Sequence, residues 1–291
     1  MNETVSIIIP VYNEKDHIMK LVHDIHERMD SSGFNFELIL VDDGSTDGGS
    51  EVVNQLALPD VKKVVHSHNK GYGAALKSGI LAAENDIIVI TDADGTYPSE
   101  MIPELIREID GCEMVVGART GREVRVPFPR RPAKWFIGKL ANYLSGMKIP
   151  DLNSGLRVMR KDVVSRFIRL LPDGFSFTTT ITIAMLTNGY SVKYVPINYY
   201  RREGKSKIRP IEDTLNFIQL IIRTSLYFNP LRVFVPLSFL LVVFAFIVVV
   251  GSWLITGRVM DMTFGIIMMT AVIVMTVGML ADVIDKKSSL K

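Results

Sequence analysis

The chain carries two kinds of hydrophobic pattern, which divide it into two parts. Over roughly residues 1–210, short apolar runs alternate with segments whose apolar residues recur every three or four positions. The first pattern is typical of strands and the second of helices that cover a sheet. This alternation predicts an α/β fold with a mainly parallel sheet and right-handed crossovers. Toward the C-terminus, long uncharged apolar runs replace it.

The individual elements follow from this alternation. The predicted strands are the apolar runs at residues 5–11, 36–41, 62–66, 87–90 and 114–116. The predicted helices cover residues 15–30, 74–83 and 101–109. The first helix has an apolar face made of Ile18, Leu21, Val22, Ile25 and Met29. Ser45 or Thr46 is placed to cap a helix that follows the second strand.

Two uncharged runs, at residues 233–255 and 263–281, are separated by a short polar turn. As a helix, the first is about 34 Å long, enough to cross a hydrocarbon core of about 30 Å. A hairpin buried in a protein core is the alternative, but both runs are too long and too uniform for it. Two spans put the N-terminal domain and the C-terminus on one side. Lysine and arginine crowd that side, at 201–232 and 286–291, which predicts a two-span cell-membrane protein with a cytoplasmic N-terminal domain.

Residues 211–228, just before the first run, form an amphipathic pattern. Such a helix either joins the protein core or lies on the bilayer surface, and its place beside the apolar runs favours the surface. The sequence thus predicts three parts: a domain at 1–210, an interfacial helix at 211–230, and a transmembrane hairpin with a cytoplasmic tail at 231–291.

Composition sets further limits on function. The formal net charge of +2 gives no sign of a nucleic-acid partner. The single cysteine excludes an internal disulfide and fits a reducing compartment. The N-terminus lacks the basic region and apolar stretch of a secretory signal peptide, so none is expected there. No feature of the sequence indicates an oligomeric state.

The strongest candidate chemistry follows the run at 87–90, where Asp92-Ala93-Asp94-Gly95 ends a strand that is predicted to be buried. Because an unpaired carboxylate is costly to bury, both acids belong at the carboxyl edge of the sheet, where open α/β folds bind ligands. Two adjacent carboxylates suit Mg²⁺ or Mn²⁺, with substrate phosphates completing the coordination. A turn with solvated aspartates explains this stretch equally well when it is taken alone.

Other strands end in polar residues too, and this favours a binding site over a turn with solvated aspartates. Tyr12 and Glu14 follow the first strand, and Asp42 and Asp43 follow the second. Arg119 follows a further predicted strand, at residues 114–116. Since parallel strands end at one edge, these groups converge on the two acids and predict a nucleotide-diphosphate site.

Two basic loops accompany this site. Residues 121–132 contain three prolines and four arginines, including Arg130 and Arg131, and residues 201–209 have the same charge sign. They are either solvated surface loops or clamps for phosphate, which arginine binds in a bidentate manner. Two such loops beside a diphosphate site suit an enzyme with two anionic substrates.

Several motifs, in this order, resemble the inverting family 2 glycosyltransferases of the GT-A fold, over roughly residues 4–210. They are Pro10-Val11-Tyr12-Asn13-Glu14, Val41-Asp42-Asp43-Gly44-Ser45, Asn69-Lys70-Gly71-Tyr72-Gly73 and Asp92-Ala93-Asp94-Gly95. Two later stretches resemble the branch that transfers a sugar to a polyprenyl phosphate, the dolichyl-phosphate mannose, glucose or N-acetylglucosamine synthases. These stretches are Asp151-Leu152-Asn153-Ser154-Gly155-Leu156-Arg157 and Arg202-Glu203-Gly204-Lys205-Ser206-Lys207.

The resemblance implies a role for each matching residue. The nucleotide would be held by Pro10, Tyr12, Glu14, Asp42, Asp43, Asp92 and Ala93. The metal would be held by Asp92 and Asp94. Thr96 stands where some members have a metal-binding glutamine, so the third ligand is either its hydroxyl or a water. Asp94, Arg119, Arg202 and Lys207 would act in catalysis, and Arg130, Arg131 and Ser206 would meet the acceptor phosphate.

The resemblance also implies the reaction. A nucleotide sugar would give its sugar to a membrane polyprenyl (dolichyl) phosphate in one inverting displacement, with UDP-glucose or UDP-N-acetylglucosamine favoured as donor over GDP-mannose. The alternatives are a family 2 transferase that elongates a lipid-linked glycan or polysaccharide, and a non-catalytic membrane scaffold that binds a nucleotide sugar.

Overall fold

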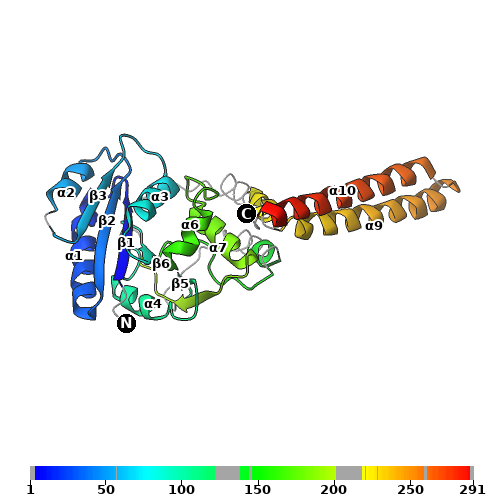
Figure 1. Cartoon of the computed structure of the whole chain (residues 1–291). Coiled ribbons are helices and arrows are strands. Elements are labelled where there is room, and N and C mark those ends of the chain that lie inside the picture. The colour runs from blue at the N-terminus through cyan, green and yellow to red at the C-terminus, as the bar shows by residue number, and fades with distance from the viewer. Residues whose placement is uncertain are drawn as a thin grey trace.

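An α/β body and a pair of long helices that project from it make up the chain (Figure 1). The computed structural model describes residues 4–56, 58–121, 138–143, 146–200, 218–219, 221–227, 229–258 and 261–288. Some residues predicted for the site lie outside this described part: Arg130, Arg131, Arg202, Ser206 and Lys207.

The body is built on a seven-stranded sheet in the order β3-β2-β1-β4-β6-β5-β7. The strands are β1 (Thr4–Val11), β2 (Asn35–Asp42), β3 (Val61–Val65), β4 (Ile87–Ile90), β5 (Met114–Ala118), β6 (Arg157–Arg160) and β7 (Val192–Pro196). Strand β6 runs antiparallel to β4 and β5, and the remaining pairs are parallel. The predicted α/β fold with a mainly parallel sheet is therefore confirmed.

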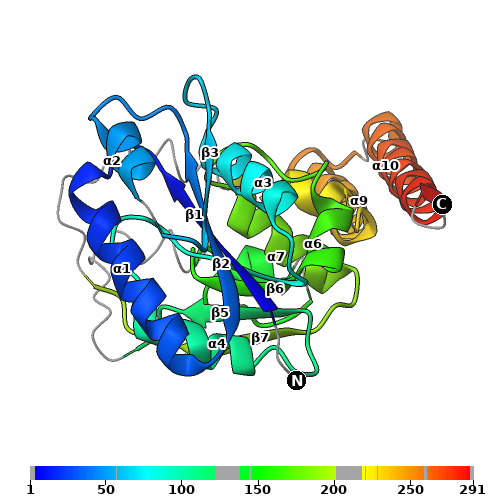
Figure 2. The same ribbon diagram turned by 60° about the vertical axis from the view of Figure 1, so that its left-hand side comes forward.

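The central strands are apolar on both faces because helices cover both sides of the sheet. All four residues of β4 are buried, and so are seven of the eight residues of β1, from Val5 onward. One core lies between the sheet and helices α1 (Lys15–Ser32), α2 (Gly49–Gln55) and α4 (Ile102–Arg107). The other lies beneath α3 (Tyr72–Ala82), α6 (Lys161–Phe167) and α7 (Phe177–Thr187). Figure 2 shows the sheet between these two groups of helices.

The predicted elements agree with the structure in most places. The five residues predicted for the apolar face of α1 are all buried. The predicted helix at 101–109 is shorter at both ends: a 3₁₀ turn (η1, Ser99–Met101) precedes α4, which ends at Arg107. The prediction that Ser45 or Thr46 caps the next helix is wrong: α2 begins at Gly49, after Gly48, and the amide of Gly49 donates instead to Oδ1 of Asp47 at 2.8 Å.

A third hydrophobic cluster connects the body to the projecting helices. Residues 221–227 are helical, and Ile221 is fully buried against Ile183 and Leu186 of α7. Val233, near the start of the first long helix, packs against the same cluster. Part of the predicted interfacial helix therefore packs on the protein. Its residues 211–217, 220 and 228 lie outside the described part.

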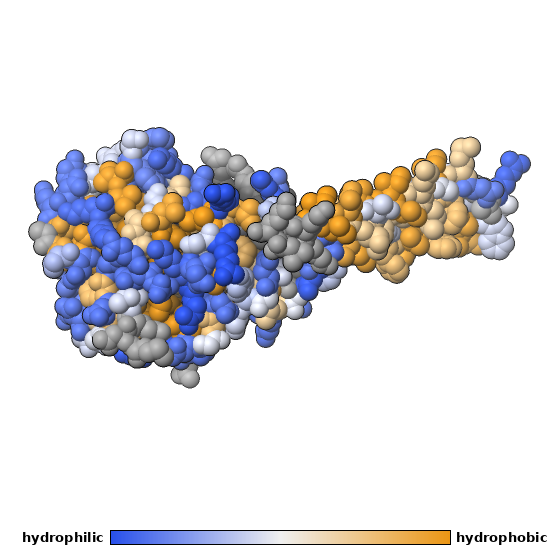
Figure 3. Space-filling model, viewed as in Figure 1, coloured by the Kyte–Doolittle hydropathy of each residue, from blue (hydrophilic) through white to orange (hydrophobic). Residues whose placement is uncertain are grey.

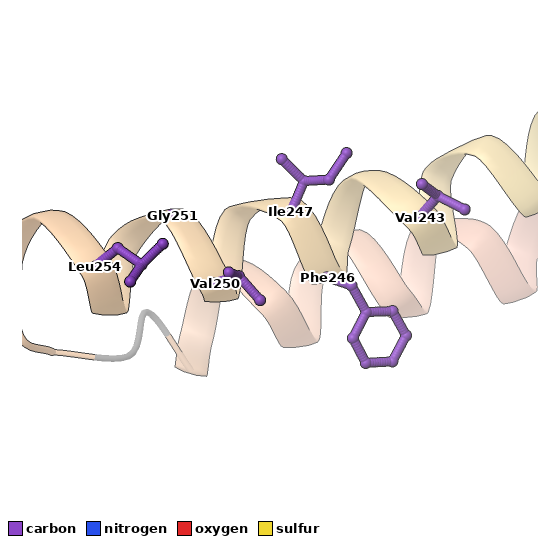
Figure 4. Close-up of a pocket in the computed structure, with 6 residues that line it drawn as sticks. All are labelled: Val243, Phe246, Ile247, Val250, Gly251 and Leu254. Carbon is purple, nitrogen blue, oxygen red and sulfur yellow. The ribbon is translucent and has the colours of Figure 1, made fainter.

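The two long helices are α9 (Leu231–Thr256) and α10 (Asp261–Ser288), and each is long and apolar enough to cross a membrane. They pack together, with the hydroxyl of Ser238 donating to the carbonyl of Ala271 at 2.9 Å. Their surface is mostly hydrophobic, whereas that of the body is mostly hydrophilic (Figure 3). An apolar groove on α9, far from the strand ends, is lined by Val243, Phe246, Ile247, Val250, Gly251 and Leu254 (Figure 4).

Candidate active site at the carboxyl edge of the sheet

The polar residues predicted to meet at one edge of the sheet do so. Strands β2, β1 and β4 are parallel neighbours, with Val11 opposite Asp42 and Ile8 opposite Ile90. Their polar continuations therefore lie side by side. Strands β4 and β5 are each antiparallel to β6 and hence parallel to each other, which brings Arg119 to the same edge.

The two aspartates after β2 hold the loops around them. Asp42 is fully buried, and its carboxylate accepts from the amide of Ser45 at 3.0 Å and from the hydroxyl of Ser50. Asp43, 3% exposed, accepts from the amides of Lys70 at 2.9 Å and Gly71 at 2.8 Å. It also contacts Nδ1 of His66 at 2.6 Å. These bonds give both carboxylates a scaffolding function, and their predicted nucleotide contact stays a prediction.

The loops after β1 and β2 are joined by short polar contacts. Asn13 has a left-handed backbone (φ 57°), and its side-chain oxygen accepts from the amide of Thr46 at 2.8 Å. The amide of Asn13 donates to the hydroxyl of Ser45 at 3.1 Å. Ser45 and Thr46 both form hydrogen bonds with Asn13, and neither caps α2. Beside the junction, Tyr12 is 42% exposed and open to a ligand.

The carboxylate of Asp92 is tightly packed. The hydroxyl of Tyr72 donates to its Oδ1 at 2.8 Å. On another side lies Gly155, where a Cβ atom would come within 2.6 Å of Oδ2, so only glycine fits. The amide of Gly155 donates to the hydroxyl of Tyr97 at 2.6 Å. Burial, followed by the charge of Asp92, raises the pKa of both tyrosines, which therefore remain protonated.

Asp94 is oriented by the residue two positions later. Thr96 is 1% exposed, and its hydroxyl donates to Oδ1 of Asp94 at 2.6 Å. Its amide reaches the same oxygen at 3.2 Å. The hydroxyl proton of Thr96 is therefore donated to Asp94. That the hydroxyl oxygen also binds a metal ion stays a prediction.

The donor set fits a cation that is completed by substrate. Asp92 and Asp94 offer carboxylate oxygens, which Mg²⁺ and Mn²⁺ prefer. Among the described residues, no group of three or more histidine, cysteine, aspartate and glutamate side chains could hold a metal ion. Such a pair of acids suits an ion whose remaining ligands are diphosphate oxygens and water.

Arg119 forms a bidentate ion pair with Asp151. Its Nε lies 2.7 Å from Oδ2 and its Nη2 lies 2.9 Å from Oδ1, while its amide also donates to Oδ2 at 2.9 Å. Its guanidinium lies 5.2 Å from the ring centre of Tyr199. Burial opposes the charge of Asp151, but hydrogen bonds and charge from Arg119 outweigh burial and lower its pKa to about 2.

Several residues that shape this edge were not predicted from the sequence. They are Tyr72, Tyr97, Asp151, Gly155 and Arg157. All except Tyr97 belong to stretches that the resemblance had singled out, residues 69–73 and 151–157, but nothing in the sequence pairs them with Asp92 or Arg119.

The chain belongs to glycosyl transferase family 2, whose sequence profile matches residues 6–167. It is 29% identical over 210 residues to the dolichyl-phosphate hexose transferase of Haloferax volcanii, covering 72% of this chain and 88% of that protein. It is 32% identical over 215 residues to the polyprenol monophosphomannose synthase of Mycolicibacterium smegmatis, covering 69% of this chain and 80% of that protein.

Solved structures agree on the fold. Glucosyl-3-phosphoglycerate synthase from Mycobacterium tuberculosis, solved with UDP, matches with a TM-score of 0.60 at 18% identity, covering 77% of this chain and 80% of that chain. The same enzyme solved with Mn²⁺, UDP and glucosyl-3-phosphoglycerate matches with a TM-score of 0.57 at 20% identity, over 77% of this chain and 79% of that chain. The fold is thus that of GT-A glycosyltransferases.

Proposed function

We propose that this protein transfers a sugar from a nucleotide sugar to the phosphate of a membrane polyprenol, giving a polyprenyl-phosphate sugar for glycan assembly. One observation carries the proposal. A single chain combines the acidic strand-end edge of a family 2 transferase with two helices long enough to cross a membrane. A soluble acceptor requires no such helices, whereas a polyprenyl phosphate lies in the bilayer.

The names of the relatives support this acceptor. The Haloferax protein is a dolichyl-phosphate hexose transferase and the Mycolicibacterium protein a polyprenol monophosphomannose synthase. A further relative, at 33% identity over 172 residues, is a prophage bactoprenol glucosyl transferase homolog of Escherichia coli. Their donors differ, so the preference for UDP-glucose or UDP-N-acetylglucosamine over GDP-mannose rests on a resemblance alone: Gly95-Thr96-Tyr97, which follow the acids, are similar to the corresponding stretch of relatives that use those UDP-sugars.

The reaction we propose is one displacement at the anomeric carbon, with inversion. The acceptor phosphate is already ionised and needs little help from a general base. The main barrier is electrostatic repulsion, because the acceptor phosphate must approach the donor diphosphate, a second anion. Mg²⁺ or Mn²⁺ held by Asp92 and Asp94 would supply charge neutralisation of the leaving diphosphate.

The remaining residues position the two substrates. Tyr12, with Pro10 and Glu14, lines the nucleotide pocket beside the Asp42–Asp43 corner. The donor phosphates and the attacking phosphate are steadied by Arg119, Arg202 and Lys207. The acceptor phosphate is received by Arg130, Arg131 and Ser206. No covalent glycosyl-enzyme is needed.

The membrane arrangement is part of the proposal. Helices α9 and α10 form a two-span hairpin, and residues 1–210, the interfacial segment 211–230 and the C-terminal tail lie on the cytoplasmic side. The excess of lysine and arginine on that side supports this orientation.

A lipid-extraction assay tests the reaction. The full chain in detergent, with Mn²⁺, a radiolabelled nucleotide sugar and dolichyl or undecaprenyl phosphate, is expected to yield a chloroform-soluble labelled lipid. Free dolichol, which lacks the phosphate, is the matched control and should give none. Absence of product with UDP-glucose, UDP-N-acetylglucosamine and GDP-mannose alike would overturn the proposal.

A thermal-shift series resolves the donor. UDP-sugars are expected to raise the melting temperature more than GDP-mannose or dTDP-sugars, because at equal concentration the ligand with the lower Kd stabilises the folded state more. Equal shifts from all three nucleotide classes would contradict the preference for uridine.

A further inference from the structure

Arg157 is a fully buried cation beneath the candidate site. Its side chain is 0% exposed, and each of its hydrogen bonds goes to a neutral acceptor. Nε donates to the carbonyl of Ser154 at 2.7 Å, and Nη2 donates to that of Leu152 at 2.9 Å. Nη1 donates to the hydroxyl of Thr182 at 2.5 Å and lies 3.6 Å from Sδ of Met114.

No carboxylate of the described residues forms an ion pair with this guanidinium. Arginine stays protonated in proteins, although burial lowers the pKa of Arg157. A buried charge without a counterion is costly unless its environment or its function compensates. The neutral acceptors satisfy its hydrogen bonds but leave its charge in place. The nearby carboxylate of Asp151 offsets part of the burial cost but is itself paired with Arg119.

The position of this charge relates it to the acids. In the sheet, Arg157 lies opposite Ile90 of β4, and Asp92 follows Ile90 by two residues. The carbonyls that it binds belong to the loop that carries Asp151 and Gly155, and Gly155 abuts the carboxylate of Asp92. Arg119, on the same edge, forms an ion pair with Asp151, whereas Arg157 forms none with a carboxylate of the described residues.

We propose that Arg157 is a positioning residue whose unpaired charge strengthens binding of the anionic nucleotide at this edge without touching it. The inference rests on the proposed function, because the nucleotide diphosphate and the carboxylates concentrate negative charge at one place. A cation in the protein interior is screened far less than one at the surface, so we expect its charge to act on the edge, which begins two residues beyond Ile90 on the neighbouring strand.

The competing explanation is that Arg157 only pins the loop at residues 151–155. Thr182→Asp separates the two. It places a carboxylate against Nη1, neutralises the charge and keeps the bonds of Arg157 to Ser154 and Leu152. Thr182→Asn is the matched control for charge, since it has nearly the same size and an acceptor oxygen. Thr182→Val controls for loss of the bond that the hydroxyl donates to the carbonyl of Thr178 at 2.7 Å.

The measurement is the affinity of the full chain in detergent for UDP and GDP, by calorimetry with saturating Mg²⁺ and no acceptor. We expect the aspartate variant to bind about tenfold more weakly than the asparagine variant, with no lower melting temperature. We expect this difference to persist at high salt, because the charge is buried. Equal affinities of the two variants would refute the role of Arg157. If the unaltered protein bound neither nucleotide, the proposed function itself would fail.

A second pair covers the case in which Thr182→Asp does not fold. Arg157→Lys keeps the charge and loses the planar fork, whereas Arg157→Met loses both. We expect the lysine variant to bind nucleotide more tightly than the methionine variant, even if both melt at the same temperature, below that of the unaltered protein. Equal nucleotide binding by the two variants would refute the proposal, because it would show that the planar guanidinium acts by holding the loop at residues 151–155 and not through its charge.

Discussion

At the scale of single residues, the site depends on contacts that fix the acids in place. Asp92 lies between the hydroxyl of Tyr72 and the backbone of Gly155. Asp94 is held by Thr96. Replacing a residue that orients a metal ligand typically weakens metal binding by about 10- to 100-fold.

Gly155→Ala tests this dependence. The added methyl group would lie within 2.8 Å of all three carboxyl atoms of Asp92 and would displace the carboxylate. We expect the Mn²⁺ concentration for half-maximal transfer to rise by about 10- to 100-fold. Gly174→Ala is the control, because a Cβ there meets nothing within 4 Å. Unchanged Mn²⁺ dependence in the Gly155 variant would remove Asp92 from the proposed metal site.

The ion pair of Asp151 makes a prediction about pH. Because the pKa of Asp151 is about 2 in the folded protein, against an ordinary value of 3.8, its charge stabilises the fold above pH 3.8. That contribution disappears as the pH falls from 3.8 through about 2.

Asp151→Asn is therefore expected to lower the free energy of unfolding by about 2 kcal/mol near neutral pH. The gap to the unaltered protein should narrow as acid is added, as measured by denaturant unfolding at several pH values. Asp162→Asn, which removes an exposed pair with Arg166, should change stability by less than about 0.5 kcal/mol. A gap that stayed constant with pH would contradict the assignment.

The sequence predicted the acids but not their supports, for a physical reason. Asp92 and Asp94 end an apolar run, and that local pattern is visible in one stretch of chain. The contact of Tyr97 with Gly155 joins residues 58 positions apart, and only the folded sheet brings them together.

At the scale of elements, the strands that were predicted are marked by apolar runs, and α1 by a periodic apolar face. Helix α1 has one buried face, so its apolar residues are periodic. Helix α7 is buried on every side from Phe177 to Leu186 and so has no such period. Strand β6 has only four residues and begins with the buried Arg157, so no apolar run marked it. Helix α6 and strand β7 were not predicted either.

The hairpin of α9 and α10 offers an element-scale test. At Gly278 a Cβ atom would lie 2.4 Å from that of Phe234, so the two helices are in close contact there. Gly278→Leu is expected to destabilise the hairpin by about 1–3 kcal/mol, seen as a lower melting temperature in detergent. Gly265→Leu, where a Cβ meets nothing within 4 Å, should leave that temperature unchanged. Equal effects at both positions would contradict this packing.

At the scale of the whole molecule, the proposed orientation can be read from chemical labelling. Cys112 is the only cysteine, so Cys112→Ser gives a background without thiols. Arg258, in the turn between α9 and α10, and Asp110, in the body, are both exposed.

We expect an impermeant maleimide on intact cells to label Arg258→Cys and to leave Asp110→Cys unlabelled. After the cells are lysed, both should react. Labelling of Asp110→Cys alone in intact cells would reverse the proposed topology, and labelling of both would exclude a membrane-spanning hairpin.

The reversed direction of β6 has a consequence for how the enzyme is made. Strands β1 to β4 form from successive units of neighbouring sequence, so their acids can assemble early in synthesis. Gly155 and Arg157 come much later, at the start of a strand that inserts between β4 and β5. Contacts between distant parts of a chain form slowly. A nascent chain therefore carries Asp92 and Asp94, with Tyr72 and Thr96, well before Gly155. We expect the site to become competent only when β6 has inserted between β4 and β5.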